Sequence, residues 1–305
     1  MGELFWLIVL GISLYLLIKG ADWFTLGAES VGYRLGMSSF VIGVLIVSVG
    51  TSLPELASSL AAVFQGTTEI VVANIVGSNI ANSLLVLGIV ALIGGGIVTK
   101  RDVAKVDMPI LFVATIFLVL VSFNGVLSSI EASIFLALLV GYVWWLLKNK
   151  HEEQIEIVQS KFISVILLIG GCITLIISSA FLIESVVIVS NFFGISPAII
   201  SASIVAFGTS IPEIVVSILA VLKNKKDLAL GNVLGSNIFN ILLVGGVAGL
   251  FAPLLIDQRI LFLGLPVVVL ATSILWIFLY KQEINKIQGA GLVISYLLFL
   301  SLLFW

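Results

Sequence analysis

The sequence has few charged residues and almost no histidine or cysteine. Only 10% of its 305 residues are charged, whereas 61% are hydrophobic, so it has too little polar surface to cover a water-soluble globule. Its single cysteine, Cys172, excludes an intramolecular disulfide. Its single histidine, His151, lies in a polar linker, which excludes a Ser–His dyad inside the apolar segments. The chain is therefore predicted to be an integral membrane protein and not an enzyme.

Apolar runs of about 20 residues, long enough to cross about 30 Å of hydrocarbon, predict ten transmembrane helices. The predicted spans are 4–24, 39–63, 69–93, 108–124, 130–147, 162–183, 197–222, 228–250, 260–280 and 288–305. A transmembrane barrel is excluded, because its strands need only about ten residues of alternating polarity. The first run follows no basic segment or cleavage site and is expected to be a retained span rather than a signal peptide.

The basic residues orient these spans, because Lys and Arg accumulate in the cytoplasmic loops of membrane proteins. Thirteen of the fourteen lie at or in the loops that follow odd-numbered spans, and Arg259 is the exception. They are Lys19, Arg34, Lys100, Arg101, Lys105, Lys148, Lys150, Lys161, Lys223, Lys225, Lys226, Lys281 and Lys286. Both termini are therefore predicted to lie outside the cell, in a multi-pass protein of the plasma membrane.

Two motifs repeat at one spacing. GTSLPE (50–55) returns as GTSIPE (208–213), and NIVGSNIAN (74–82) returns as NVLGSNIFN (232–240), each 158 residues later. The repeats predict two five-helix halves, 1–147 and 162–305, joined by a short cytoplasmic linker, 148–161. Since each half has an odd number of spans, the second must be inverted relative to the first. Inverted repeats are typical of secondary transporters, which bind substrate and coupling ions near the membrane midplane.

The repeated motifs place polar side chains on single faces of apolar helices. Ser48, Thr51, Ser52 and Glu55 follow the spacing i, i+3, i+4, i+7, and the second half places Ala206, Thr209, Ser210 and Glu213 at the same spacing. The neighbouring spans add Asn74, Ser78 and Asn82, and Asn232, Ser236 and Asn240. Lipid cannot satisfy these groups, so the stripes are expected to face one another or water. Asn74 and Asn232 are expected mainly to bond neighbouring helices.

Proline and carboxylate complete an oxygen-only donor set. Pro54 and Pro212 have no N–H to bond the preceding turn, which frees backbone carbonyls. Hydroxyl, amide, carbonyl and carboxylate oxygens suit hard cations such as Ca²⁺, Mg²⁺ and Na⁺, whereas Zn²⁺ or copper would require His or Cys. Glu55 and Glu213 are the carboxylates near the middle of spans, and two carboxylates neutralise one divalent or two monovalent ions. A site that binds one divalent ion and then monovalent ions in turn would be the site of an antiporter.

In these features the chain resembles the sodium/calcium exchangers of the cation/calcium antiporter superfamily, in their compact prokaryotic form. The resemblance rests on GTSLPE with GSNIAN, on GTSIPE with GSNIFN, and on the two five-span halves. It implies exchange of several Na⁺ inward for one Ca²⁺ outward, with spans one and six sliding together to expose the site to each side in turn. These ions are cargo, and no resident cofactor is expected. The implied ion ligands are Ser48 (carbonyl), Thr51, Ser52, Glu55, Ser78, Asn82, Ala206 (carbonyl), Thr209, Ser210, Glu213, Ser236 and Asn240.

One position departs from that family, and two alternatives stay open. Many members have aspartate where this chain has Asn240, so the stoichiometry and the choice of cation are not determined by the resemblance. Proton coupling is the nearest alternative, because a buried glutamate can exchange protons. A cation channel would use similar oxygens, although buried carboxylates and inverted halves favour alternating access. No nucleic-acid partner is expected. The sequence does not specify the oligomeric state and is compatible with a monomer.

Overall fold

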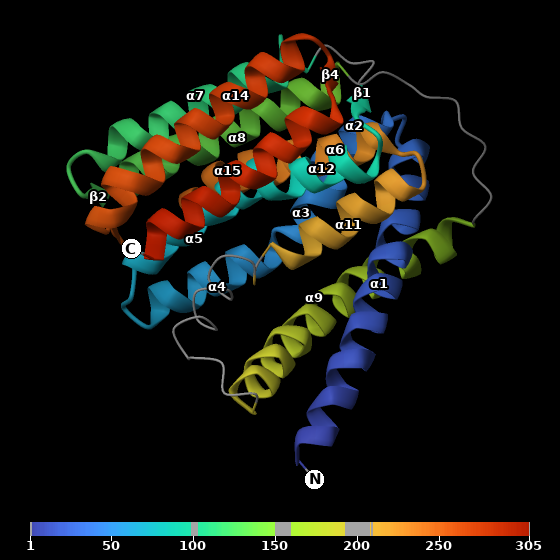
Figure 1. Ribbon diagram of the computed structural model, residues 1–305. Helices are drawn as coiled ribbons and strands as arrows, with labels where there is room; N and C mark the ends of the chain where they lie inside the picture. Colours follow the sequence, from blue (N-terminus) through green and yellow to red (C-terminus); the bar gives the residue numbers. More distant parts are fainter. Residues whose placement is uncertain (1, 99–102, 150–159, 193–207, 209, 305) are drawn as a thin grey trace.

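The computed structural model describes residues 2–98, 103–149, 160–192, 208 and 210–304, and this part of the chain is almost entirely helical (Figure 1). The helices are α1 (Gly2–Arg34), α2 (Ser39–Ile42), α3 (Ser48–Thr51), α4 (Leu53–Phe64), α5 (Glu69–Ile80), α6 (Leu87–Ile93), α7 (Asp107–Ser122), α8 (Ser129–Lys148), α9 (Lys161–Phe192), α11 (Ile211–Leu222), α12 (Lys226–Phe239), α13 (Gly245–Phe251), α14 (Leu265–Tyr280) and α15 (Lys286–Phe304). Wider π-helical turns join several of them: η1 (Gly43–Val47), η2 (Ala81–Val86), η3 (Asn240–Val244) and η4 (Ile260–Gly264).

Eight helical segments of the described chain are long and apolar enough to cross a membrane, which confirms an all-α membrane protein. They are Phe5–Arg34, Ser39–Phe64, Glu69–Ile93, Ser129–Lys148, Lys161–Val189, Lys226–Phe251, Ile260–Tyr280 and Lys286–Leu303. Two shorter apolar helices, Asp107–Ser122 and Ile211–Leu222, lie at the predicted spans 108–124 and 197–222. Residues 197–207 of the latter lie outside the described part.

The first helix is longer than predicted. The apolar run predicts an end near residue 24, whereas α1 continues to Arg34. The hydropathy falls after residue 21 because Asp22 and Glu29 follow, yet both carboxylates form ion pairs with lysines of the second half. Paired charges are tolerated in a helix that a hydropathy average would terminate.

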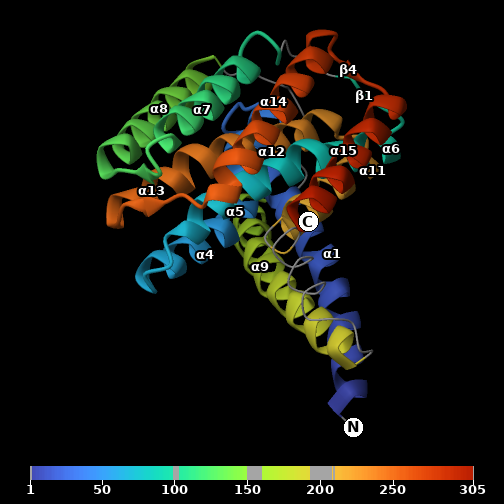
Figure 2. The same ribbon diagram turned by 60° about the vertical axis from the view of Figure 1, so that its left-hand side comes forward.

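The helices differ strongly in how much of them is buried. In α5 with α6, and in α12 with α13, 83% of the most apolar window is buried, compared with 22% in α1 and in α9. Figures 1 and 2 both show α1 and α9 side by side, projecting from the body formed by the other helices. The centre of the fold is therefore the crossing of α5 and α12, where the repeated GSN motifs lie.

Helices α1 and α9 approach each other closely through glycines. A Cβ at Gly27 would lie 2.2 Å from the backbone nitrogen of Leu168, and a Cβ at Gly171 would lie 2.3 Å from that of Phe24. No side chain larger than hydrogen fits at these distances. The Ser30 and Ser164 hydroxyls add a hydrogen bond of 2.6 Å between the same two helices. The pair is thus a closely packed unit of its own.

Two short antiparallel ladders connect the loops. Strand β1 (Ile97–Val98) pairs with β4 (Glu283–Ile284), and β2 (Val126–Leu127) pairs with β3 (Leu254–Leu255). In the first ladder Ile97 is opposite Ile284, and in the second Leu255 is opposite Val126. A shift of 158 residues converts one register into the other. Figure 1 shows the two ladders at opposite ends of the body.

Candidate functional site

Equivalent serines of the two motifs have the same backbone geometry. Ser52 separates α3 from α4 with φ −86° and ψ 3°, and Ser210 precedes α11 with φ −85° and ψ 4°. Pro54 and Pro212 stand in the first turn of the helix that follows each serine. Because Pro54 has no N–H, the Gly50 carbonyl loses its helical donor, and the thiol of Cys172 on α9 lies 3.9 Å from it as a weak donor.

The predicted site residues are buried. Ser48, Thr51, Ser52, Glu55, Ser78, Asn82, Ser210, Glu213, Ser236 and Asn240 are each at most 4% exposed. The other two predicted ligands, Ala206 and Thr209, lie outside the described residues. The ten described residues come from α3, α4, α5 and η2 and the Ser52 position between α3 and α4 in the first half, and from Ser210, α11, α12 and η3 in the second.

Hydrogen bonds join the site residues of one half to those of the other. The Ser52 hydroxyl donates to Oε1 of Glu213 at 3.4 Å, and the Ser236 hydroxyl is 3.5 Å from the same oxygen. The Thr51 hydroxyl lies 3.3 Å from that of Ser236 and donates to Oδ1 of Asn232 at 3.2 Å. Oxygens from both motifs therefore converge on one carboxylate.

Several polar atoms of this site lie buried and have no hydrogen bond within the described part of the chain. They are Oε2 of Glu213 and both amide atoms of Asn82 and of Asn240. Burying such groups without a partner costs on the order of 1–3 kcal/mol each, and much more for a charged oxygen. Their oxygens can offer lone pairs to a cation, and the set fits a hard cation because no sulfur or imidazole belongs to it.

The other two asparagines of the repeats have structural partners. The Asn74 amide donates to the Ser59 hydroxyl at 3.2 Å, and the Asn232 amide donates to the Ser217 hydroxyl at 2.9 Å. These contacts tie α5 to α4 and α12 to α11, as expected for residues that bond neighbouring helices. Ser59 and Ser217 were not predicted, although each stands four residues after the glutamate of its motif.

A second asparagine pair also escaped prediction. Asn79 and Asn237, the third residues of the two GSN triplets, are each 1% exposed. The Asn237 amide donates to the Ser83 hydroxyl at 2.9 Å, which links α12 to η2. A shift of 158 residues takes Ser83 to Ile241, so the equivalent contact of Asn79 has no hydroxyl. The crossing of the two motifs is thus not fully symmetric.

Comparison with protein families finds a match in both halves of the chain. The model described as "Sodium/calcium exchanger protein" matches residues 5–148 and 163–305. The sodium/calcium exchanger MaX1 of Methanosarcina acetivorans is 33% identical over 346 residues, which cover 98% of each chain. The inner membrane protein YrbG of Escherichia coli is 28% identical over 310 residues, 96% of this chain and 95% of that one.

Comparison with solved structures finds the same architecture. The sodium-calcium exchanger NCX_Mj, in a crystal soaked with 100 mM Na⁺ and 10 mM Sr²⁺, superposes with a TM-score of 0.87. Its sequence is 31% identical, and the match covers 98% of each chain. The similarity therefore extends over the whole fold, including the motifs that meet at Glu213.

Proposed function

The chain belongs to the sodium/calcium exchanger family, and on that premise we propose that it exchanges Na⁺ for Ca²⁺ by alternating access. The observation that carries the proposal is the Glu213 carboxylate, which is fully buried and bonds hydroxyls of both halves. A cation bound there would contact both repeats at once, and a movement of α1 and α9 together against the rest of the protein would expose it to each side in turn.

The proposed cage has twelve contributors with three roles. Glu55 and Glu213 supply charge, while hydroxyls and amides supply neutral oxygens that replace water around the ion. The carbonyls of Ser48 and Ala206 complete the set. The full list is Ser48, Thr51, Ser52, Glu55, Ser78, Asn82, Ala206, Thr209, Ser210, Glu213, Ser236 and Asn240. The amides of Asn82 and Asn240 are buried and have no hydrogen bond within the described residues, which supports their inclusion.

We infer a topology of ten membrane-crossing helices in two inverted halves, 1–147 and 162–305, with both termini outside. Three observations support it: the family match to two separate segments, the ladders related by a shift of 158 residues, and the distribution of basic residues. A Na⁺ gradient is available at the plasma membrane, which is the proposed location. Na⁺ entry would drive Ca²⁺ out of the cell.

Flux in liposomes tests the exchange directly. Purified protein is reconstituted in vesicles loaded with Na⁺, which are diluted into Na⁺-free medium containing ⁴⁵Ca²⁺. Uptake should require the Na⁺ gradient and should saturate with Ca²⁺. Glu213→Gln should lower uptake by about a hundredfold, because losing one carboxylate contact to a buried cation costs on the order of 3 kcal/mol. Glu283→Gln, which changes an exposed glutamate of β4, is the matched control and should retain uptake.

Two outcomes would contradict the proposal. Uptake driven equally well by a pH gradient without Na⁺ would indicate proton coupling. Ohmic single-channel current that needs no counter-ion on the opposite side would indicate a channel. Normal uptake by Glu213→Gln would remove this residue from the transport site.

A further inference from the structure

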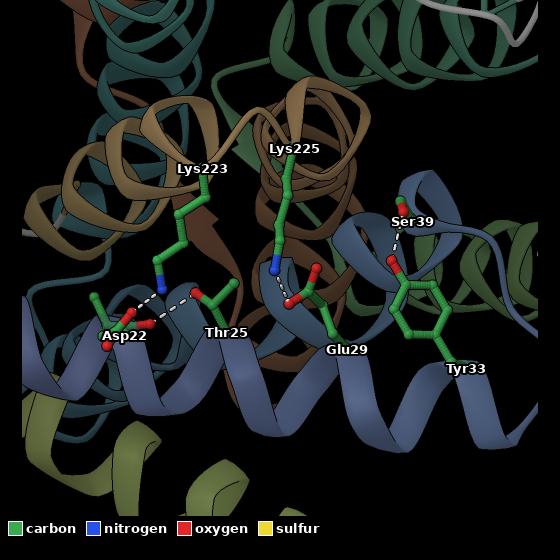
Figure 3. Close-up of polar contacts among 8 residues, drawn as sticks. Asp22, Thr25, Glu29, Tyr33, Ser39, Lys223 and Lys225 are labelled. Atoms are coloured by element: carbon green, nitrogen blue, oxygen red, sulfur yellow. Dashed lines mark hydrogen bonds and ion pairs between the residues drawn. The ribbon is translucent and has the colours of Figure 1, made fainter. Parts of the chain in front are cut away.

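Helix α1 packs against α11, α2 and η1 of the body, and charged side chains add two further contacts. Asp22 and Glu29 on α1 are seven residues apart, so they lie two turns apart on the same face. That face is turned toward the turn between α11 and α12, which carries Lys223 and Lys225 (Figure 3). Lys223 pairs with Asp22, and Lys225 pairs with Glu29.

The two ion pairs differ in their exposure to solvent. The side chains of Lys223 and Asp22 are 36% and 30% exposed, so water and salt screen this pair. The Glu29 side chain is only 7% exposed, and its partner Lys225 is 29% exposed. A buried carboxylate depends strongly on its partner, because separation leaves an uncompensated charge. The Glu29–Lys225 pair is therefore the stronger constraint.

The lysine-bearing turn itself is attached to the body. Asn224 adopts φ 60°, and the Lys225 amide donates to the Ala220 carbonyl at 2.8 Å, which closes a tight turn after α11. The Lys226 ammonium donates to the Gly96 carbonyl beside β1 at 2.7 Å. The turn is thus fixed on the body side, and its other two lysines reach across to α1.

The equivalent turn of the first half has the same backbone but none of these charges. Gly66 has φ 76°, and the Thr67 amide donates to the Ala62 carbonyl at 2.9 Å, as Asn224 and Lys225 do in the second half. A shift of 158 residues takes Lys223 and Lys225 to Gln65 and Thr67, and it takes Asp22 and Glu29 to Ala180 and Val187 on α9. The Asp22–Lys223 and Glu29–Lys225 ion pairs thus have no counterpart at the positions related to them by the repeat.

The ion pairs at the α11–α12 turn affect the relative free energy of the two end states of alternating access. If the repeats were identical, exchanging their roles would interconvert two end states of equal free energy. Here the two ion pairs stabilise the state in which α1 lies against the α11–α12 turn. We propose that Asp22–Lys223 and Glu29–Lys225 form an electrostatic latch that positions the α1–α9 pair and favours this conformation over the alternative one.

The latch rests on the proposed function, because it assumes that α1 and α9 move as a unit against the body. Its residues do not contact the ion. They are positioning residues, which set the ratio of the two conformations rather than the chemistry of the cage.

Distance measurement by pulsed electron paramagnetic resonance tests the latch without any transport assay. In a Cys172→Ser background, spin labels at Tyr15 on α1 and Ile277 on α14 report the position of the pair, and labels at Val140 on α8 and Ile277 report the body. All three labelled side chains are at least 61% exposed. Glu29→Gln should populate a second α1–body distance, which differs from the first by on the order of one helical turn. The population of this second distance relative to the first should rise by about tenfold. Asp22→Asn should raise the same relative population by only about two- to threefold, because Asp22 is more exposed and its ion pair is weaker.

Charge exchange separates a latch from a general structural role. Glu29→Lys combined with Lys225→Glu should restore the single distance, and Lys19→Gln, which neutralises an exposed charge on the same helix, should leave it unchanged. The distance within the body should stay constant in every variant. An unchanged α1–body distance in both Glu29→Gln and Asp22→Asn would overturn the latch, as would a charge exchange that fails to restore it. If the distances shift as expected but wild-type vesicles show no Na⁺-driven Ca²⁺ uptake, the exchange proposal fails and the latch stands.

Discussion

At the scale of single residues, Glu213 shows how the two motifs depend on each other. Its Oε1 lies within hydrogen-bond distance of the hydroxyls of Ser52 and Ser236, while Oε2 has no hydrogen bond in the described part of the chain. Neutral hydroxyls compensate a buried carboxylate poorly without a cation. We therefore expect the site to hold positive charge and to be less stable without it.

If Asn240 belongs to the proposed cage, we expect position 240 to set how much positive charge the cage can hold. With amides at Asn82 and Asn240, Glu55 and Glu213 are the only carboxylates of the proposed cage. We expect Asn240→Asp to change the number of Na⁺ exchanged per Ca²⁺ or the apparent affinity for Na⁺, because an added carboxylate offsets one more cation. Equilibrium ⁴⁵Ca²⁺ distribution at a series of fixed Na⁺ gradients measures the number directly. If neither quantity changed, residue 240 would not be a ligand.

The serines that follow each motif glutamate are expected to contribute to stability. Ser217→Ala removes the acceptor of the Asn232 amide and leaves a buried donor unpaired, which should cost about 1–3 kcal/mol of unfolding free energy. Thermal unfolding in detergent, followed by tryptophan fluorescence, measures the loss. Ser273→Ala is the matched control, because the Ser273 hydroxyl bonds only the Val269 carbonyl of its own helix in the described structure. Equal melting temperatures for both variants would exclude this role.

At the scale of elements, α1 and α9 are joined by backbone proximity rather than by interlocking side chains. Gly27 and Gly171 allow the helices to approach so closely that the pair excludes a methyl group at either position. This packing resembles the small-residue interfaces by which membrane helices associate without a hydrophobic driving force. The pair can therefore act as one body against the rest of the protein.

Two neighbouring glycines of α9 provide an internal comparison for this packing. Gly171→Ala should destabilise the protein by about 1–3 kcal/mol, since its methyl group would overlap the backbone of Phe24. Gly170→Ala adds the same methyl where no atom lies within 4 Å, so it should be neutral or stabilising by about 1 kcal/mol. Melting temperatures of both variants in the same detergent give the comparison. A Gly171→Ala variant as stable as Gly170→Ala would show that α1 and α9 are not tightly packed.

At the scale of the whole molecule, the inferred topology places the two β-ladders on opposite sides of the membrane. The β1–β4 ladder lies at the predicted cytoplasmic end, and the β2–β3 ladder lies at the predicted external end. Each ladder joins a loop of the first half to a loop of the second. We therefore infer that they connect the two halves outside the hydrocarbon.

Cysteine labelling tests that orientation. In a Cys172→Ser background, Asp257→Cys near β3 should react with a membrane-impermeant maleimide on intact cells. Glu283→Cys in β4 should react only after permeabilisation, because its loop is predicted to be cytoplasmic. Both side chains are exposed, so lack of access to solvent would not explain a difference. The opposite pattern would invert the topology, and equal labelling on intact cells would contradict the placement of the ladders on opposite sides.

Much of the fold and of the candidate site could be predicted because lipid removes most alternatives. Apolar length located the helices, and the repeat at 208–213 and 232–240 identified which polar faces would meet. Hydropathy failed at the end of α1, since an average cannot tell a solvated charge from a paired one. The helix-bonding serines, Ser59 and Ser217, were missed because a hydroxyl in a helix usually bonds its own backbone, as Thr115 does.

The sequence by itself determined the medium, the helices, the repeat and the identity of the oxygens, because these follow from composition and from period. Tertiary structure alone decided which oxygens share a carboxylate and that glycines bring α1 against α9. It also decided that Asp22 and Glu29 meet two lysines 201 and 196 residues away in the sequence. The physical reason is that partner choice depends on distances across the fold. The two repeats share one pattern, and contacts such as the latch distinguish their ends.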